Sequence, residues 1–226
     1  MRVTDPEVFL VDVCGTLVRD DTTVGLLHHH ISRISPRSLR LALFSALSSR
    51  RSPLWWCFAG LEAVLRRHLL KHVLVRLLEG DAVSELQESA RGYASHLLGF
   101  RRVRPVWAVI EPALGTQRLF LASASLEPIV ESLASMLRAP YVASTLESRD
   151  GVLTGRYLED LTGGKREALE RKFGSETFQG PLCVISDNVS DRPILESAAR
   201  RYVVLNRRSD RRKWRGLDAA CLKVDE

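Results

Sequence analysis

The chain has 226 residues, of which 45% are hydrophobic and 27% charged, as is ordinary for a folded, water-soluble protein. Its net charge of +6 predicts a surface that attracts anions, such as phosphorylated metabolites, nucleic acid or acidic lipid. No apolar run is long enough for a membrane span. The four cysteines form no CxxC pair, which excludes common zinc spacings and favours reduced thiols. Residues 1–7 are polar and do not resemble a secretory signal, so we expect a cytoplasmic protein.

The first predicted strand ends in a carboxylate. Residues 8–11 (VFLV) form an apolar run, Asp12 follows, and Gly15 and Thr16 then turn the chain. We therefore expect Asp12 at the C-terminal tip of a strand, the edge at which open α/β sheets bind ligands. The alternative interpretation is a strand followed by an ordinary Asx-type turn.

Few strand signals occur in the next stretch, and residues 24 to about 100 are predicted to be helical. His28, His29 and His30 are consecutive, but adjacent side chains on a helix point in different directions and cannot all bind one metal ion. Residues 38–47 predict a short apolar helix, and residues 54–58 (LWWCF) open a second one after a basic break.

The charge and aromatic content of this stretch leave two interpretations open. Tryptophans beside arginines are typical of a membrane interface, and the segment from Leu61 to Leu78, which includes basic residues at 66–68, is amphipathic. The same side chains are equally suited to helices that pack over an active site. The first interpretation predicts peripheral contact with an anionic membrane, on its inner face. The second requires only that these residues form a core.

Three further motifs follow in the second half of the chain. Residues 119–125 (LFLASAS) predict a buried strand that ends in small hydroxyl residues, among them Ser123. Lys165 follows two glycines at the start of a helical pattern. Residues 182–186 (LCVIS) predict another buried strand, which leads to Asp187 and Asp191. Taken singly, the lysine is typical of a helix surface and the two aspartates of a helix N-terminus.

The remaining elements are simpler. A helix is predicted after Leu126, a strand at 141–147, and a hairpin turn at Asp150-Gly151. Residues 192–198 predict a short helix and residues 202–205 the last core strand. The basic tail at 207–215 is interpreted as a solvated terminal helix, and nucleic acid is not an expected partner, because one tryptophan is no stacking platform.

The order of carboxylate, hydroxyl, lysine and carboxylate pair at strand ends resembles the haloacid dehalogenase-like phosphohydrolases, from about residue 8 to about residue 206. Within them it resembles the phosphoserine-phosphatase-like branch, in which the succession of Thr145-Leu146-Glu147, Asp150-Gly151 and Thr154-Gly155 recurs. The resemblance implies a doubly wound, mainly parallel α/β (Rossmann-like) core formed by residues 1–19 and 106–226. Residues 20–105 would then be a helical cap inserted after the first strand.

The resemblance also implies roles for individual residues. Asp12 would be the nucleophile that forms an aspartyl-phosphate. Ser123, Ala124 and Lys165 would bind the phosphate of a small phosphorylated substrate. The implied cofactor is Mg²⁺, bound by Asp12, Asp187, Asp191 and the backbone carbonyl of Cys14. The apolar and basic cap favours a glycoconjugate or lipid-linked phosphate as substrate.

Cys14 departs from the pattern of the resembled family, which usually has a second aspartate there as general acid and base. A neutral thiol, with a reference pKa of about 8.5, is a weaker donor and a poorer proton shuttle. Three hypotheses stay open: a slow phosphatase, a catalytically silent phosphate-binding protein, and a basic membrane-associated scaffold.

Overall fold

The apolar runs of the sequence become neighbouring strands of one sheet. In the computed structural model, which describes residues 7–65 and 69–224, the sheet has seven strands in the order β4-β3-β2-β1-β5-β6-β7. Neighbouring strands are parallel except β3 and β4, which form an antiparallel hairpin. The strands are β1 (Val8–Val11), β2 (Leu119–Leu126), β3 (Tyr141–Arg149), β4 (Val152–Glu159), β5 (Leu182–Ser186), β6 (Arg200–Leu205) and β7 (Ala220–Lys223).

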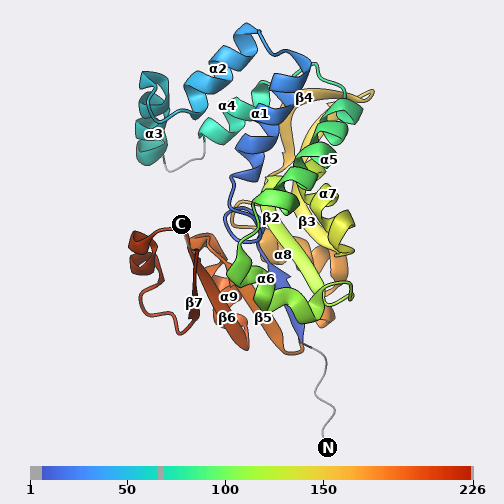
Figure 1. The fold of residues 1–226 in the computed structure, drawn as a ribbon, viewed down its shortest axis with the longest axis vertical. Coiled ribbons are helices and arrows are strands. Elements are labelled where there is room, and N and C mark those ends of the chain that lie inside the picture. Colours follow the sequence, from blue (N-terminus) through green and yellow to red (C-terminus); the bar gives the residue numbers. More distant parts are fainter. Residues whose placement is uncertain (1–6, 66–68, 225–226) are drawn as a thin grey trace, which may run out of the picture.

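Helices cover both faces of this sheet (Figure 1). The helix α7 packs on β2 and β3, and α5 packs on α7, whereas α8 and α9 lie on the opposite face. The α-helices are α1 (Thr22–Ile34), α2 (Leu39–Ser48), α3 (Pro53–Leu65), α4 (Leu69–Arg76), α5 (Val83–Phe100), α6 (Arg104–Ile110), α7 (Glu127–Leu137), α8 (Lys165–Phe173) and α9 (Arg192–Ser197). Short 3-10 helices are η1 (Glu111–Ala113), η2 (Ser175–Phe178), η3 (Val189–Asp191) and η4 (Arg208–Trp214).

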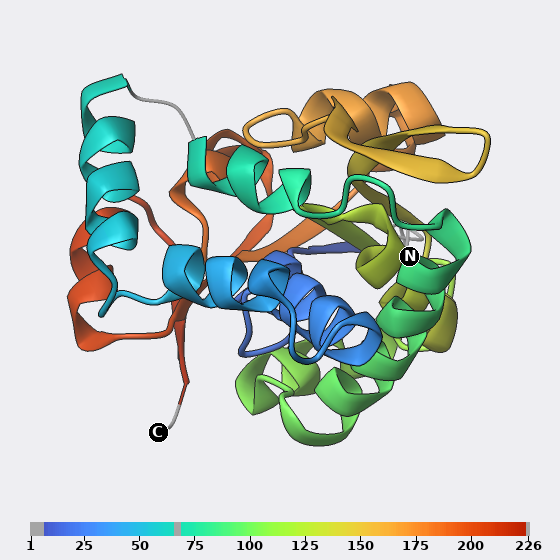
Figure 2. The same cartoon turned by 90° about the horizontal axis from the view of Figure 1, so that it is seen from above.

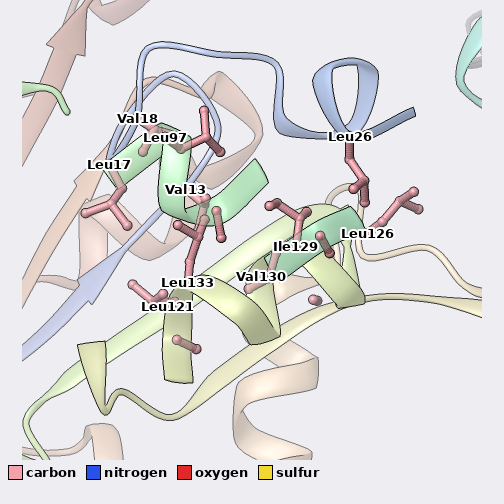
Figure 3. Close-up of a cluster of buried hydrophobic side chains, with 14 of the residues drawn as sticks. Val13, Leu17, Val18, Leu26, Leu97, Leu121, Leu126, Ile129, Val130 and Leu133 are labelled. Carbon is pink, nitrogen blue, oxygen red and sulfur yellow. The ribbon is translucent and has the colours of Figure 1, made fainter. Parts of the chain in front are cut away.

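The central strands bury both of their faces, because alternate side chains of a strand point to opposite sides. Phe9 and Val11 of β1 enter the core beneath α5 and α7, whereas Leu10 enters the core beneath α8 and α9. The first core continues past the end of β1, where Val13 and Leu17 pack near Leu133 of α7 and Leu97 of α5 (Figure 3). The strand that precedes Asp12 is therefore fixed by packing on both sides.

The helices α1 to α4 lie beyond the C-terminal edge of the sheet, and the view from above shows them crossing over it (Figure 2). The β3–β4 hairpin reaches up to them. Its strand β4 pairs with the linker between α4 and α5, where Gly80 N donates to Leu153 O at 3.0 Å and Leu153 N to Asp81 O at 2.9 Å. The helical segment is thus hydrogen-bonded to the sheet as well as packed against it.

A buried polar network joins the helices of this segment. His30 of α1 is fully buried, with Nε2 3.1 Å from Asp81 Oδ2 and Nδ1 2.9 Å from Ser89 Oγ of α5. Arg40 of α2 forms an ion pair with the same Asp81. His29 instead stacks on Tyr93, so the neighbouring histidines do point in different directions, as predicted.

The doubly wound, mainly parallel α/β fold predicted from the sequence is confirmed. The prediction that residues 202–205 are the last strand is wrong, because β7 adds a parallel edge beside β6. Its four residues are mostly exposed and are held by backbone hydrogen bonds, so no apolar run marks it. The basic tail is a 3-10 helix rather than a solvated terminal helix, and its Trp214 is buried.

Within the described residues, no helix has both the length and the apolar character needed to cross a bilayer. Residues 1–6 and the basic residues 66–68, on which some of the sequence predictions fall, lie outside the described part of the chain.

Candidate active site

Four separate chain segments meet at the C-terminal edge of the central strands. Asp12 follows β1, Ser123 lies in β2, Lys165 begins α8, and Asp187 follows β5. All four line one cavity of about 540 Å³, which Cys14 and Ala124 also line and which α4 covers with Leu70, Lys71 and Leu74. The residues that the sequence pattern singled out are thus brought together, although Asp191 does not itself line the cavity.

Lys165 connects two of the predicted carboxylates. Its Nζ lies 2.8 Å from Asp12 Oδ1 and 2.7 Å from Asp191 Oδ2, and all three side chains are buried. Burial alone would lower the pKa of Lys165, but the charges of Asp12 and Asp191 outweigh it and raise the pKa above its ordinary value. The ammonium group is therefore a fixed positive charge beside Asp12.

Asp191 lies behind Lys165 and is not one of the residues that line the cavity. Its Oδ2 accepts hydrogen bonds from both Lys165 Nζ and Ser186 Oγ, the latter at 2.7 Å. These contacts orient the lysine. The predicted role of Asp191 as a metal ligand stays a prediction.

Asp187 is held by two polar side chains that the sequence analysis did not assign to the site. Thr16 Oγ1 donates to Asp187 Oδ1 at 3.2 Å, and Asn206 Nδ2 donates to Asp187 Oδ2 at 2.9 Å. Thr16 stands in the turn after Asp12, so its position in the sequence could have indicated that it belongs to the site. Asn206 follows β6 with no local signal.

Glycine is required at position 15 because the Asp187 carboxylate lies so close to it. Its φ of +69° lies in the left-handed region, and a Cβ atom there would overlap Asp187 Oδ2. Asn206 Nδ2 also donates to the Gly15 carbonyl at 2.9 Å. The turn after Asp12 and the side chain of Asp187 therefore pack closely against each other.

The negative charge of the carboxylates at the cavity is only partly compensated by positive charge. Burial raises the pKa of Asp12, to which the charge of Asp191 adds, while Lys165 opposes the rise. Burial and the facing carboxylate of Asp12 raise the pKa of Asp187 to about 7. One lysine thus compensates only part of the negative charge of three aspartates.

The donor set fits a divalent cation. In the described part of the chain, no three histidine, cysteine or acidic side chains surround a common point. Asp12 and Asp187 face each other at the cavity, where both carboxylates are available to an ion. Mg²⁺ commonly binds proteins through one or two carboxylates and takes its other ligands from water and phosphate. A cation between these groups would relieve the repulsion that raises both pKa values.

Cys14 lies half-buried at the same cavity. Burial, together with the charges of Asp21 and Asp12, raises the pKa of its thiol well above the ordinary value. The thiol is therefore neutral at physiological pH, and it can donate a proton only weakly.

Lys71 of α4 is a cavity residue that the sequence analysis did not single out. Its Nζ donates to Ala124 O at 2.8 Å and to Asp160 Oδ1 at 2.8 Å, and it lies 3.1 Å from Thr162 Oγ1. It thus ties α4 to the end of β2 and to the loop before α8. As one lysine among several basic residues of an amphipathic stretch, it carried no distinguishing signal.

A family model for haloacid dehalogenase-like hydrolases matches residues 9–196. The chain belongs to this family of hydrolases. No curated protein sequence matches it.

Solved structures share the fold at low sequence identity. One is a protein of unknown function from Bordetella pertussis Tohama I, with a TM-score of 0.73, 17% identity, and coverage of 98% of this chain and 100% of that one. A cytosolic 5′-nucleotidase IIIB bound to cytidine gives a TM-score of 0.61 at 16% identity, over 97% and 80% of the two chains. A phospho-aspartyl intermediate analogue of phosphoserine phosphatase gives 0.53 at 14% identity, over 97% and 93%.

Proposed function

We propose that this protein hydrolyses phosphomonoesters through a covalent intermediate on Asp12. The observation that carries the proposal is the placement of the Lys165 ammonium 2.8 Å from Asp12, in a cavity that Ser123 and Asp187 also line. Phosphoryl transfer requires mainly a positioned nucleophile and positive charge around the phosphate oxygens. The family membership and the structural likeness to a phosphoserine phosphatase support the same reaction class.

In the proposed reaction, a carboxylate oxygen of Asp12 forms a bond to phosphorus as the bond from phosphorus to the leaving-group oxygen breaks. Lys165 and Ser123 hold the phosphoryl oxygens. The leaving group takes up a proton. Cys14 would donate this proton, because it stands where the family usually has its acid–base aspartate. Water then attacks phosphorus and gives a proton back to Cys14, the bond from phosphorus to Asp12 breaks, and inorganic phosphate and the Asp12 carboxylate result. Bound Mg²⁺ would supply positive charge between Asp12, Asp187 and the phosphate.

We propose the helical segment of residues 20–105 as the cap over the core formed by residues 1–19 and 106–226. Val24 of α1 and Leu70 and Leu74 of α4 give the cavity an apolar wall opposite the aspartates. This wall suits a small phosphomonoester with a partly apolar leaving group, a class that includes glycoconjugate and lipid-linked phosphates. The cytoplasm is the proposed location.

The first experiment removes the nucleophile and the cation separately. Hydrolysis of an aryl phosphate is measured for the wild-type chain, for Asp12→Asn and for the wild-type chain with a chelator. We expect both treatments to abolish turnover, and we expect added Mg²⁺ to restore only the chelated sample. Asp218→Asn, outside the cavity, is the matched control and should keep full activity. Turnover that survives both treatments would exclude the mechanism.

A catalytically silent phosphate-binding protein is the second candidate, and the neutral thiol of Cys14 favours it. Such a protein would be stabilised against heat by inorganic phosphate and Mg²⁺ together but would release no phosphate from any ester. A thermal-shift assay run beside the turnover assay separates the two functions.

A further inference from the structure

The outward face of α2 and α3 exposes large apolar side chains to solvent. Leu39 is 86% exposed and Trp56 64%, and Leu43, Leu54 and Leu61 are each more than 40% exposed. Both views place α3 at the edge of the molecule (Figures 1 and 2), where α2 and α4 are its main packing partners. We refer to these five side chains as the α2–α3 face.

The α2–α3 face is not explained by the core of the helical segment. Phe44 and Leu47 of α2 are buried and Phe58 of α3 is partly buried, so both helices already present apolar side chains inward. From Pro53 to Leu61, the sequence of α3 has no charged residue. Large apolar side chains that are exposed together on two neighbouring helices mark a site of interaction.

The sequence around the α2–α3 face is predominantly basic. Residues 34–65 contain four arginines and one acidic residue, Glu62. Arg40 is paired with Asp81, whereas Arg37, Arg50 and Arg51 are exposed. The last two lie in the loop between α2 and α3, directly beside the tryptophans.

Arginine and tryptophan are in contact within this loop. The Arg50 guanidinium lies 5.5 Å from the centre of the Trp55 ring, and the Arg50 carbonyl accepts a hydrogen bond from Trp56 Nε1 at 2.9 Å. Indole rings flanked by exposed arginines are suited to the boundary between lipid headgroups and acyl chains, where the rings are half in apolar surroundings and the cations meet phosphate.

We propose that the α2–α3 face docks the protein on an anionic lipid bilayer. The leucines and Trp56 enter the headgroup boundary, and Arg37, Arg50 and Arg51 contact lipid phosphates. A second copy of the chain is a poorer partner, because a two-fold contact through this face would bring the arginines of both copies together, and Glu62 is the single acidic residue in the sequence of α2, α3 and their loop. Docking does not depend on the proposed phosphatase activity.

The test is co-sedimentation of the full chain with vesicles of phosphatidylcholine, with or without phosphatidylglycerol, at low and high salt. We expect binding only to the anionic vesicles, weakened by salt. Arg50→Glu with Arg51→Glu should lower the partition coefficient by about 30-fold or more, since each basic residue near an anionic surface contributes about fivefold. Trp56→Gln with Leu61→Gln should lower it by roughly tenfold or more.

Phe100→Gln is the matched control, because Phe100 is 80% exposed at the end of α5, outside the α2–α3 face. It should bind as the wild type does. Circular dichroism checks that each variant is folded, and aryl-phosphate turnover in the same samples reports the active site separately. Failure of the folded wild-type chain to sediment with anionic vesicles would overturn the proposal. So would equal binding by all variants, or self-association that only the Trp56 and Leu61 changes remove.

Discussion

Cys14 is the residue at which this chain departs most from the site pattern of the haloacid dehalogenase-like hydrolases. The residues around it keep the nucleophile, the lysine and the facing carboxylate in one cavity. What Cys14 does not supply is a side chain that can both give and take a proton near neutral pH, because burial holds its thiol neutral. The rate of the proposed reaction is therefore expected to be limited by proton transfer rather than by phosphate binding.

Replacing this residue tests that expectation. Cys14→Asp should raise the turnover of an alkyl phosphate by roughly 100-fold, the lower end of what general acid and base catalysis contributes. An aryl phosphate, whose leaving group needs no proton, should gain much less. Cys14→Ser, which adds no acid, is the control and should stay near wild-type turnover. If neither substrate is hydrolysed by either form, phosphate binding without catalysis becomes the better interpretation.

Asp187 makes the stability of the cation-free protein depend on pH. The pKa of its carboxyl is about 7 in the folded chain, against an ordinary value of 3.8. A raised pKa means that the folded state holds the proton more tightly, so its contribution to stability is full below about pH 4 and is lost as pH rises through 7. Without a cation, stability should fall across that range.

Removing the charge of Asp187 and adding Mg²⁺ should each stabilise the chain at high pH. In chelator, Asp187→Asn should be more stable than wild type at pH 8, by about 1–3 kcal/mol, and equal to it near pH 4. Mg²⁺ should stabilise the wild type increasingly as pH rises and should leave the variant unchanged. Thermal unfolding at several pH values measures both. A wild-type stability that does not respond to Mg²⁺ at pH 8 would contradict this cation site.

At the scale of elements, Lys71 links the helix α4 to the core across the cavity. Its partners belong to the end of β2 and to the loop before α8, and its side chain is only about one-fifth exposed. Burial alone would raise the pKa of Asp160, but its hydrogen bonds with Lys71 and Thr162 outweigh burial and lower it. The ion pair is therefore maintained at neutral pH.

Removing this link should change substrate binding more than chemistry. Lys71→Met should raise KM by roughly fivefold to tenfold with a smaller change in kcat, because α4 and its apolar wall lose their anchor above the phosphate site. The loss of stability should be about 1 kcal/mol, as expected for a partly exposed pair. Arg76→Met, which breaks an exposed pair with Glu79 at the end of the same helix, is the control and should leave KM unchanged. An equal KM for both variants would refute the anchoring role.

The network around Asp81 should make the helical segment sensitive to acid. Burial alone would raise the pKa of Asp81, but hydrogen bonds from His30 and Arg40 outweigh it and lower the pKa from 3.8. A lowered pKa contributes stability that is present above pH 4 and is lost as pH falls below it. Asp81→Asn should therefore destabilise the chain by about 2–4 kcal/mol at pH 7 and much less at pH 3. Urea unfolding at the two pH values measures this, with Glu79→Gln as the exposed control; an equal effect at both would rule out ionisation as the cause.

For the whole molecule, the sequence predicted the features that depend on local pattern. Strands β1, β2 and β5 are continuous apolar runs, and a parallel arrangement brings their C-terminal ends to one edge, so Asp12, Ser123 and Asp187 could be expected to meet. Asn206 and Lys71 could not be predicted as site residues, because only the folded chain brings Asn206 to Asp187 and Lys71 to the cavity. The edge strand β7 escaped prediction because backbone hydrogen bonds, rather than buried side chains, hold it.

The position of β1 in the sheet has a consequence for the way the protein is made. Val11 pairs with Leu121 on one side and with Ile185 on the other, so the strand that presents Asp12 is synthesised before both of the strands that it pairs with. Until then, an apolar segment with unpaired edges is exposed to other nascent chains. Ribosome-bound chains that end before β5 should consequently recruit holding chaperones and bind no phosphate.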